Sequence, residues 1–495
     1  MERITPAASV LLAREARSRE VFLVKRGRDL RFFGGFWAFP GGKVAAEDDP
    51  AWRKQSAATR ELFEETGVLL ARRSDGSHPS SGPELDHLRR ELLADRISFS
   101  RILSDLDLAL QPEDFQLIGD VTTPAFAPMR FETTFFVAHL PPGQKPEIWP
   151  GELEEGRWST AADMLASWTR GDCLLSPPTL MTLQAISGRS AEDAPARLGP
   201  LLASLQAGKI HPIFFAPGVQ MIPLRTMGLP PSTHTNAFLV GNCPSYLLDP
   251  GPAAQDEQQR LFDLLDEQAA AGRRLTAIVL THHHPDHIGA ANACARRYNI
   301  PIWAHPWTSE KLKDRITVSR TISDGDQLPL GPCPDGSGAW HLEAIHTPGH
   351  APGHLVFFEP RYRLLFVADM ISTVSSVVIA PPEGNLTQYM QSLNRLLSFD
   401  CRLLLPAHGN VSSQAQKKID DCIAHRVKRE EQLVVALADG PRTIDELAPA
   451  LYKGLSEALM RFAKLQILAG LIKLQRESRA EQSVDGTAWK LFEYS

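Results

Sequence analysis

The sequence predicts an α/β protein built from several domains. Its 495 residues exceed one ordinary domain, which takes about 150 residues. Short strand-like runs alternate with helix-like runs along most of the chain, a pattern that favours sheets covered by helices. Hydrophobic residues make up 43% of the chain and charged residues 22%, which excludes an intrinsically disordered protein.

Charge and cysteine content exclude other classes. The net charge is -6, so no global basic field is available to hold nucleic acid. The six cysteines are far apart and form no CxxC pair, which argues against a disulfide scaffold and against a thiolate zinc site. No run approaches roughly 18 uninterrupted apolar residues, and the first apolar run is too short for a signal peptide. We therefore expect a cytoplasmic protein without membrane contact.

Changes in composition suggest where the chain divides. Residues 74–86 are polar and rich in Gly, Pro and Ser, so we expect a loop inserted in the first domain. A similar stretch at 187–200 precedes a new pattern, and the strand-like runs stop near 412–420. The expected domains and linker are 1–190, a linker over 191–210, then 211–412 and 413–495.

Periodicity and turn signals place the main elements in each domain. In the first domain we expect paired strands at 8–12 and 21–24, a helix at 55–70 and a strand at 131–139. In the second we expect a hairpin at 237–240 and 246–248, a buried strand at 277–280, a helix near 289–297, strands at 342–345, 355–358 and 364–367, and a helix near 386–397. In the third we expect helices at 425–437, from 443 and at 455–471, with 472–474 and 489–492 paired as a wing.

Three carboxylates gather on one face of the helix expected in the first domain. Glu61, Glu64 and Glu65 are spaced i, i+3 and i+4, so they are neighbours on the helix surface. They repel one another unless a cation lies between them, and all-oxygen clusters suit Mg²⁺ or Mn²⁺. Arg60 is placed to pair with one carboxylate, and the FPGG turn at 39–42 allows close approach of a ligand.

These residues resemble the Nudix hydrolase motif G-x5-E-x7-R-E-U-x-E-E-x-G-U, where U is a bulky aliphatic residue. The matching positions are Gly41, Glu47, Arg60, Glu61, Leu62, Glu64, Glu65, Gly67 and Val68. The chain has 12 residues between Glu47 and Arg60, where the family usually has seven. The resemblance implies an α/β/α sandwich in which Glu61, Glu64 and Glu65 bind Mg²⁺ or Mn²⁺ and act with Arg60 to hydrolyse a diphosphate linked to another group.

A second pattern precedes that motif. Arg26, Arg31, Gly35 and the FPGG turn have the spacing of a signature found in Nudix enzymes that cleave coenzyme A, although Gly27 and Val24 depart from it. This partial resemblance implies that Arg26 and Arg31 bind the phosphates of CoA or acyl-CoA. Generic phosphate-binding or surface arginines are the alternative, with another nucleoside diphosphate derivative as substrate.

A polar cluster follows the apolar run at 277–280. The sequence THHHPDH places His282, His283, His284, Asp286 and His287 between a strand end and a helix start. Such a cluster is implausible as core, and imidazole with carboxylate suits Zn²⁺, Fe or Mn. HTPGH, VAD and PAHG follow in order and supply His350, Asp369 and His408.

The order of these motifs resembles the metallo-β-lactamase superfamily, which implies an αββα sandwich over about 211–412. Carried over, His282, His284 and His350 bind one metal, Asp286, His287 and His408 bind the other, and Asp369 bridges both. Zinc is expected, with Fe or Mn as alternatives, and Asp286 is also expected in catalysis. Asp249 of LLDPG supports the site from behind. His354 of GHAPGH resembles a glyoxalase II-like pattern and is expected to contact substrate, with a structural role as the alternative.

The C-terminal segment resembles the winged-helix tail of the β-lactamase-like endoribonuclease branch. From Asp420 onward it carries 11 Lys and Arg against 12 Asp and Glu, so its charge does not favour RNA binding. A packing or dimerisation tail is the more probable interpretation of this composition.

Three hypotheses follow for the whole chain. Both domains can be hydrolases, the first acting on the diphosphate of CoA, acyl-CoA or a nucleoside derivative, and the second on an ester, thioester or phosphodiester. Alternatively, the second domain is an RNA-processing nuclease and the Nudix domain a regulatory binding module. In a third, the Nudix domain binds ligand without turnover. The sequence sets neither the substrates nor the oligomeric state.

Overall fold

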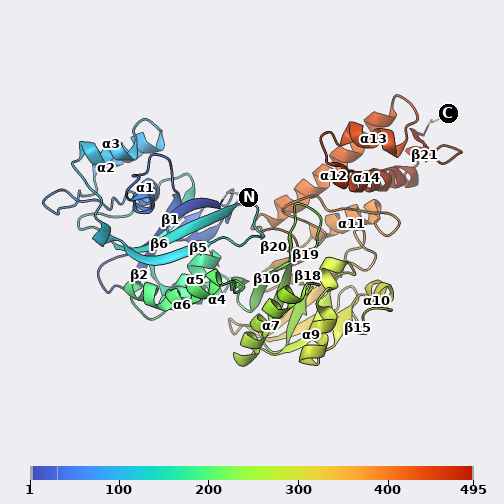
Figure 1. The fold of residues 1–495 in the computed structure, drawn as a ribbon, viewed down its shortest axis with the longest axis horizontal. Coiled ribbons are helices and arrows are strands. Elements are labelled where there is room, and N and C mark those ends of the chain that lie inside the picture. Colours follow the sequence, from blue (N-terminus) through green and yellow to red (C-terminus); the bar gives the residue numbers. More distant parts are fainter. Residues whose placement is uncertain (1–3, 31, 493–495) are drawn as a thin grey trace. The chain divides into compact units, whose positions relative to one another are not determined.

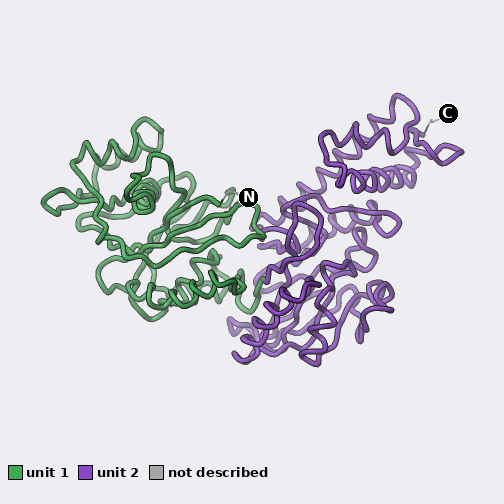
Figure 2. The backbone as a smooth tube through the Cα atoms, in the orientation of Figure 1, with its two compact units in different colours: residues 1–221 green, residues 222–495 purple. Residues whose placement is uncertain are grey.

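The computed structural model describes residues 4–30 and 32–492. The chain forms two compact units, Met1–Met221 and Ile222–Ser495, coloured separately in Figure 2. Mixed sheets and helices run through both of them (Figure 1), which confirms the predicted α/β multidomain class.

An eight-stranded sheet forms the centre of the first unit, in the order β5-β6-β1-β2-β3-β8, with β4 paired to β1 and β7 to β2. The strands are β1 (Ile4–Ala13), β2 (Glu20–Arg26), β3 (Phe36–Ala38), β4 (Gly41–Lys43), β5 (Gln116–Thr122), β6 (Arg130–His139), β7 (Leu153–Thr160) and β8 (Leu174–Leu175). The helices are α1 (Arg53–Thr66), α2 (Pro83–Leu93), α3 (Phe99–Asp105), α4 (Ala161–Thr169), α5 (Pro177–Ile186) and α6 (Ala194–Gln206). The strands expected at 8–12 and 21–24 pair antiparallel as β1 and β2.

Helices cover both faces of this sheet. Successive side chains of a strand point to opposite faces. Accordingly, Val10 and Leu12 of β1 pack in one core cluster with Leu62 of α1, whereas Leu11 packs in another with Leu180 of α5. The first unit is therefore the α/β/α sandwich that the sequence led us to expect.

The segment at 191–210, expected to be a linker, contains the 3-10 turn η2 (Ala191–Asp193) and α6. Leu198 and Leu202 of α6 are buried in the core cluster of the first unit. A Cβ atom added to Gly119 of β5 would lie 2.6 Å from Leu202 Cδ1, so the helix packs directly on the sheet. The structure therefore differs from the expected linker, because an apolar i, i+4 pair anchors this segment.

Two further sheets have the orders β15-β14-β13-β12-β11-β10-β9 and β16-β17-β18-β19-β20; β11 to β20 lie in the second unit, and the boundary after Met221 falls within β10. The strands are β9 (Ile213–Ala216), β10 (Val219–Arg225), β11 (His234–Gly241), β12 (Ser245–Leu248), β13 (Leu275–Leu280), β14 (Ile302–Ala304), β15 (Val318–Thr321), β16 (Gln327–Pro332), β17 (Ala339–His346), β18 (Leu355–Glu359), β19 (Leu364–Ala368) and β20 (Leu403–Pro406). Phe238 of β11 and Phe366 of β19 pack edge to face with ring centroids 5.2 Å apart, so the two sheets face each other. The expected hairpin is present as β11 and β12.

Helices cover these two sheets and complete the αββα sandwich. They are α7 (Gln255–Ala270), α8 (Pro285–Ile288), α9 (Ala291–Tyr298), α10 (Pro306–Leu312) and α11 (Leu386–Leu396). The helix expected near 289–297 is present as α9, and the short helix α8 precedes it. Leu393 and Leu396 of α11 are buried with Val367 of β19 in one core cluster, so α11 covers the second sheet.

The C-terminal part of the second unit comprises α12 (Ala415–Leu437), α13 (Ile444–Leu451), α14 (Glu457–Arg476), β21 (Ala480–Gln482) and β22 (Trp489–Leu491). The prediction of a strand at 472–474 is wrong, because these residues continue α14. Ile467, Leu471 and Leu474 are spaced i, i+4 and i+7 and share one buried cluster, which extends the helix. The wing is formed instead by β21 and β22, which pair antiparallel.

No helix within residues 4–30 and 32–492 is both long enough and apolar enough to span a bilayer.

Candidate metal centres

The first candidate site lies where α1 meets the turn before β4. Gly41 N–H donates to Glu65 Oε2 at 2.9 Å, which ties the helix to the turn. A Cβ atom at Gly42 would lie 2.3 Å from the Glu61 carboxylate, so only glycine allows this approach. Helix α1 ends at Gly67, whose positive φ of 74° lets its N–H donate to Phe63 O at 2.8 Å.

Arg60 lies beside the carboxylates and is held by a residue that sequence reasoning missed. Its Nη1 donates to Glu61 Oε1 at 2.9 Å and lies 3.4 Å from Glu64 Oε1. Its Nε and Nη2 each lie 3.1 Å from an oxygen of Asp48, whose side chain is fully buried. Glu47, chosen by the motif spacing, is exposed. The sequence signal that could have identified Asp48 is its position as a second acidic residue directly after Glu47.

Electrostatics around α1 favour a divalent cation. Burial raises the pKa of Glu61 to about 7, although Arg60 opposes this shift and Glu64 adds to it. Burial also raises the pKa of Glu64, and it raises that of Glu65 well above its usual value, where the charge of Glu61 contributes. The fold thus holds three carboxylates in an environment that penalises their charge. A bound cation would relieve this penalty, so the donor set fits Mg²⁺ or Mn²⁺.

Of the expected CoA-binding residues, Arg26 is described and Arg31 lies outside the described residues. Arg26 Nη2 donates to Glu152 Oε1 at 2.9 Å, while its Nε is buried without a hydrogen-bond partner. The charge of Arg26 lowers the pKa of Glu65 against the larger effect of burial, so the arginine acts on the acidic helix. Gly35 has a positive φ of 77°.

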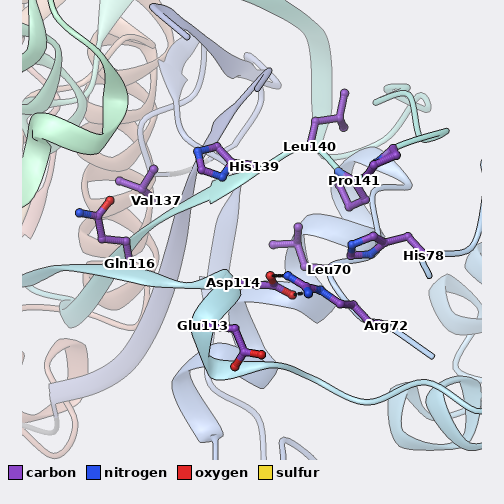
Figure 3. A pocket seen from close by; sticks show the side chains of 11 residues that line it. Leu70, Arg72, His78, Glu113, Asp114, Gln116, Val137, His139, Leu140 and Pro141 are labelled. Atoms are coloured by element: carbon purple, nitrogen blue, oxygen red, sulfur yellow. Dashed lines mark hydrogen bonds and ion pairs between the residues drawn. The ribbon is translucent and has the colours of Figure 1, made fainter. Parts of the chain in front are cut away.

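A separate cavity of about 340 Å³ lies in the first unit, beside the end of β6 and the start of β5 (Figure 3). Arg72 and Asp114 point toward each other there and are paired, with Nε 2.9 Å from Oδ2. His139 Nε2 lies 3.0 Å from Glu192 Oε1. None of the carboxylates of α1 lines this cavity, so it is distinct from the first candidate site.

The second candidate site collects the predicted histidines behind the carboxyl end of β13. His284 Nδ1 lies 2.9 Å from His282 Nε2 and 2.9 Å from His350 Nε2, so three nitrogens converge. Asp369 Oδ2 lies 3.5 Å from His350 Nε2. These four ligand atoms all lie within 4.8 Å of one another, a compact set for one ion.

A second group of ligand atoms lies on the other side of Asp369. Its Oδ1 is 3.5 Å from His287 Nε2 and 3.2 Å from His408 Nε2. Asp286 Oδ2 is 3.4 Å from His408 Nε2 and 3.9 Å from His287 Nε2. Asp369 therefore presents one oxygen to each group, which is the arrangement that a bridging ligand needs.

In four of these imidazoles, the second ring nitrogen contacts another protein group. His287 Nδ1 lies 2.9 Å from Asp249 Oδ2, and His350 Nδ1 lies 2.8 Å from Val378 O. His408 Nδ1 lies 2.9 Å from His234 O. His282 Nδ1 lies 3.0 Å from Thr281 Oγ1. Such contacts fix the ring orientation and leave the other nitrogen for a metal.

Asp249 organises the start of the cluster, in the supporting role expected for it. Its Oδ1 accepts from Thr281 N–H at 2.8 Å, and its Oδ2 accepts from Thr281 Oγ1 at 2.6 Å. The aspartate is buried and has a positive φ of 48°, a conformation that asparagine and aspartate tolerate better than most residues.

Two buried atoms of the cluster fit a role as metal ligands. Within residues 4–30 and 32–492, His287 Nε2 and Asp369 Oδ1 are buried and have no hydrogen-bond partner. Burial lowers the pKa of His282, His284 and His350, that of His284 to about 3. These rings are therefore neutral and can donate a lone pair. The donors fit divalent metal ions such as zinc.

His408 shows the opposite electrostatic behaviour. Burial lowers its pKa, but the charges of Asp369 and Asp286 outweigh that effect and raise the pKa to about 10. A divalent cation would replace the proton that these carboxylates otherwise retain on the imidazole.

His354 and His283 lie beside the cluster. His354 is completely buried, its Nδ1 lies 2.9 Å from Thr347 Oγ1, and its Nε2 accepts from Asp369 N–H at 3.3 Å. These contacts do not fit the expected substrate-binding role; they suit a residue that positions Asp369. His283 Nε2 lies 2.9 Å from Glu383 Oε2.

The late basic residues of the C-terminal part are largely engaged in ion pairs. Lys473 lies 2.5 Å from Glu430 and 2.7 Å from Glu477, and Arg479 pairs with the same two glutamates. Lys464 Nζ lies 2.5 Å from Asp445 Oδ1. These pairs neutralise the cluster that a nucleic-acid site would need.

Comparison with known families places four domain descriptions along the chain. They are a NUDIX domain at 3–92, a NUDT19 Nudix domain at 48–186, the metallo-beta-lactamase superfamily at 231–408 and a beta-lactamase associated winged helix domain at 443–489. Their order agrees with the fusion that the sequence motifs suggested.

Two curated relatives and one solved structure are similar to parts of this chain. The lactamase-like protein notP of Aspergillus sp. (strain MF297-2) is 28% identical over 250 residues, which cover 46% of this chain and 72% of the relative. The atrochrysone carboxyl ACP thioesterase of Aspergillus fumigatus is 26% identical over 265 residues, covering 50% of this chain and 77% of the relative. The crystal structure of a NUDIX hydrolase from Alicyclobacillus acidocaldarius is 30% identical with a TM-score of 0.36, covering 40% of this chain and 97% of that one.

Proposed function

Because the chain is a hydrolase that joins a Nudix domain, a metallo-β-lactamase domain and a winged-helix domain, we propose that it is a bifunctional metal-dependent enzyme. The first site cleaves a diphosphate linkage in CoA, acyl-CoA or another nucleoside diphosphate derivative. The second site hydrolyses a thioester at a dinuclear metal centre, with an ester or a phosphodiester as the alternatives that the test below distinguishes.

The convergence of ligand atoms on both oxygens of Asp369 carries the proposal for the second site. Three imidazole nitrogens face Oδ2, and two further imidazoles with Asp286 face Oδ1. We propose zinc in both positions, since neutral imidazole and carboxylate are its preferred nitrogen and oxygen ligands.

Two observations support a thioester as the substrate. One relative is an atrochrysone carboxyl ACP thioesterase. In addition, Lys473, Arg479 and Lys464 of the C-terminal part are neutralised by ion pairs, which disfavours the alternative of an RNA-processing nuclease.

The residues of this site have distinct tasks in the proposed reaction. Bound metal ions would lower the pKa of water and polarise the substrate carbonyl. Asp286, whose Oδ2 accepts a hydrogen bond from Thr235 Oγ1 at 3.4 Å, would accept the proton of the water that attacks the carbonyl carbon. The carbon–sulfur bond then breaks, and the proton passes from Asp286 to the leaving thiolate. His354 and Asp249 keep Asp369 and His287 in place.

A substrate panel tests the second site. Full-length protein loaded with zinc is incubated with an acyl-CoA thioester, a glutathione thioester, a carboxylic ester and single-stranded RNA. We expect thioester hydrolysis that Asp369→Ala reduces by at least about a hundredfold, since Asp369 holds both ions. Cleavage of RNA with the thioesters untouched would contradict the proposal and favour the nuclease.

For the first site we propose Mg²⁺ or Mn²⁺ held by Glu61, Glu64 and Glu65, with CoA or acyl-CoA among the better substrates. CoA carries a diphosphate and a 3′-phosphate, which suit the planar fork of an arginine such as Arg26. The raised pKa values of the three glutamates support a cation between them.

Competing diphosphates test this assignment. CoA, NADH, ADP-ribose and a diadenosine polyphosphate are compared at equal concentration with wild type and with Arg26→Ala. We expect CoA to be cleaved fastest and Arg26→Ala to reduce that rate about tenfold or more. Rapid cleavage of ADP-ribose with no cleavage of CoA would refute the substrate. Equal CoA cleavage by both proteins would refute the role of Arg26.

We also propose a cytoplasmic location. All six cysteines are free thiols in the structure, which suits a reducing compartment.

A further inference from the structure

Two consecutive peptide carbonyls connect the second metal centre with the C-terminal elements α12 to β22 of the same unit, here called the winged-helix part. Val378 O accepts from His350 Nδ1 at 2.8 Å. The preceding carbonyl, Val377 O, accepts from Arg426 Nη2 at 2.5 Å and from Gln466 Nε2 at 2.7 Å. Arg426 belongs to α12 and Gln466 to α14, and both helices contact α11 (Figure 1). The segment that orients one imidazole is thus itself held by the C-terminal helices.

The two side chains also hold each other. Arg426 Nη1 donates to Gln466 Oε1 at 3.2 Å, which closes a triangle of hydrogen bonds around Val377 O. Arg426 is buried although it carries no ion pair among the described contacts. A buried guanidinium requires hydrogen-bond acceptors. Two nitrogens of Arg426 donate to the Val377 carbonyl oxygen and to the amide oxygen of Gln466. Replacement of either partner would therefore remove one of the two side-chain hydrogen bonds to Val377 O and the bond that orients the other partner.

A second route leads from Arg426 to the bridging aspartate. Its guanidinium lies 5.1 Å from the centre of the Tyr389 ring in α11. Tyr389 O–H donates to Met370 O at 2.6 Å, and Met370 directly follows Asp369. A Cβ atom at Gly349 would lie 2.3 Å from Tyr389 N, so the same tyrosine packs against the residue before His350. Arg426 therefore acts on both the His350 and the Asp369 segments.

We infer that Arg426 and Gln466 are positioning residues for the metal centre, and that the winged-helix part serves to hold His350 and Asp369 in their ligating positions. This inference rests on the proposed dinuclear site, but not on the identity of the substrate. It gives the C-terminal part a task that requires no nucleic acid, in keeping with its paired charges.

Arg429 offers a matched control one turn along α12. It also stacks on a ring, with its guanidinium 4.5 Å from the centre of Tyr452, and it donates to a carbonyl, Leu451 O, at 3.2 Å. Both partners lie within the winged-helix part rather than in the segment beside His350. Loss of Arg429 therefore perturbs that part without touching the metal centre.

The test measures zinc affinity in the full-length chain by competition with a chromophoric chelator. The variants are Arg426→Met, Gln466→Met, Arg426→Lys and the control Arg429→Met. Groups behind metal ligands typically contribute 10- to 100-fold to affinity. We expect Arg426→Met and Gln466→Met to weaken zinc binding at the position that includes His350 about tenfold, Arg426→Lys to recover part of the loss, and Arg429→Met to resemble wild type.

Cobalt substitution gives a second readout. The visible spectrum of the Co²⁺ protein should change in Arg426→Met and remain unchanged in Arg429→Met, because it reports ligand geometry. Thermal unfolding of the metal-free variants separates misfolding from loss of affinity. Wild-type affinity in both Arg426→Met and Gln466→Met, or an equal loss in Arg429→Met, would overturn the inference alone. Failure of the wild type to bind zinc would overturn the proposed metal centre as well.

Discussion

Asp48 and Arg60 form a buried ion pair beside the acidic face of α1, with side chains 0% and 7% exposed. The motif spacing pointed to Glu47, because the first acidic residue after Gly41 falls at the family's position. The extra residues before α1 let the chain place the next residue, Asp48, against Arg60 instead. Motif spacing could not show which of the two adjacent acidic residues contacts Arg60, whereas the burial of Asp48 does.

Asp48→Asn should destabilise the first unit. The change removes the most buried of the three carboxylates around Arg60 while Glu61 and Glu64 remain, so the cost should stay below the about 3–5 kcal/mol of a fully broken buried ion pair. Glu47→Gln is the matched control and should change the stability by less than about 0.5 kcal/mol, because Glu47 is exposed. Denaturant unfolding followed through the first unit measures both variants. A larger effect at Glu47 than at Asp48 would show that the structure assigns the wrong acid.

Glu61 should make the metal-free first unit sensitive to pH. Burial raises its pKa from 4.5 to about 7, so the folded chain binds this proton more tightly than the unfolded chain. The associated stability is fully present below pH 4.5 and is lost as the pH rises through 7, by at most about 3 kcal/mol. With a chelator present, the unfolding temperature should therefore fall between pH 5 and 8. Mn²⁺ should restore it at pH 8, and Glu61→Gln should flatten the profile.

An unchanged pH profile in Glu61→Gln would contradict that assignment, since the titration would then belong to another group.

At the level of elements, the sequence predicted best where periodicity and burial agree. The apolar strands at 8–12, 21–24 and 277–280 and the hairpin before Asp249 are present at the expected places. The sequence predicted poorly the segments whose structure depends on a tertiary contact. Polar residues around 187–200 indicated a linker, but Leu198 and Leu202 anchor α6 on the sheet. The family resemblance predicted that the ligand side chains meet at Asp369. The hydrogen bond from Arg426 to Val377 O joins residues far apart in the chain, so no local sequence pattern indicates it.

Leu202→Ala tests whether α6 belongs to the first unit. The side chain is 6% exposed and packs against β5, so its truncation should cost about 2–4 kcal/mol of unfolding free energy. Gln206→Ala, on the exposed end of the same helix, should lie within about 0.5 kcal/mol of wild type. Equal stability of Leu202→Ala and wild type would indicate that the segment behaves as a linker.

Across the whole molecule, the two candidate sites share no residue and belong to different compact units. Glu64→Gln and Glu65→Gln should each reduce diphosphate hydrolysis at least about a hundredfold and leave thioester hydrolysis unchanged. Asp369→Ala should do the reverse. Parallel assays of both reactions on each purified variant measure this independence. Loss of both reactions in a folded single-site variant would mean that the two units are coupled.

Metal analysis tests the central claim most directly. Full-length protein carrying Glu64→Gln and Glu65→Gln, purified with zinc and freed of loosely bound ions, isolates the second site. The seven ligands, Asp369 among them, predict about two zinc ions per chain, and Asp369→Ala in the same background should retain fewer than one. A folded protein with the ligands intact and no bound metal would contradict the dinuclear hydrolase.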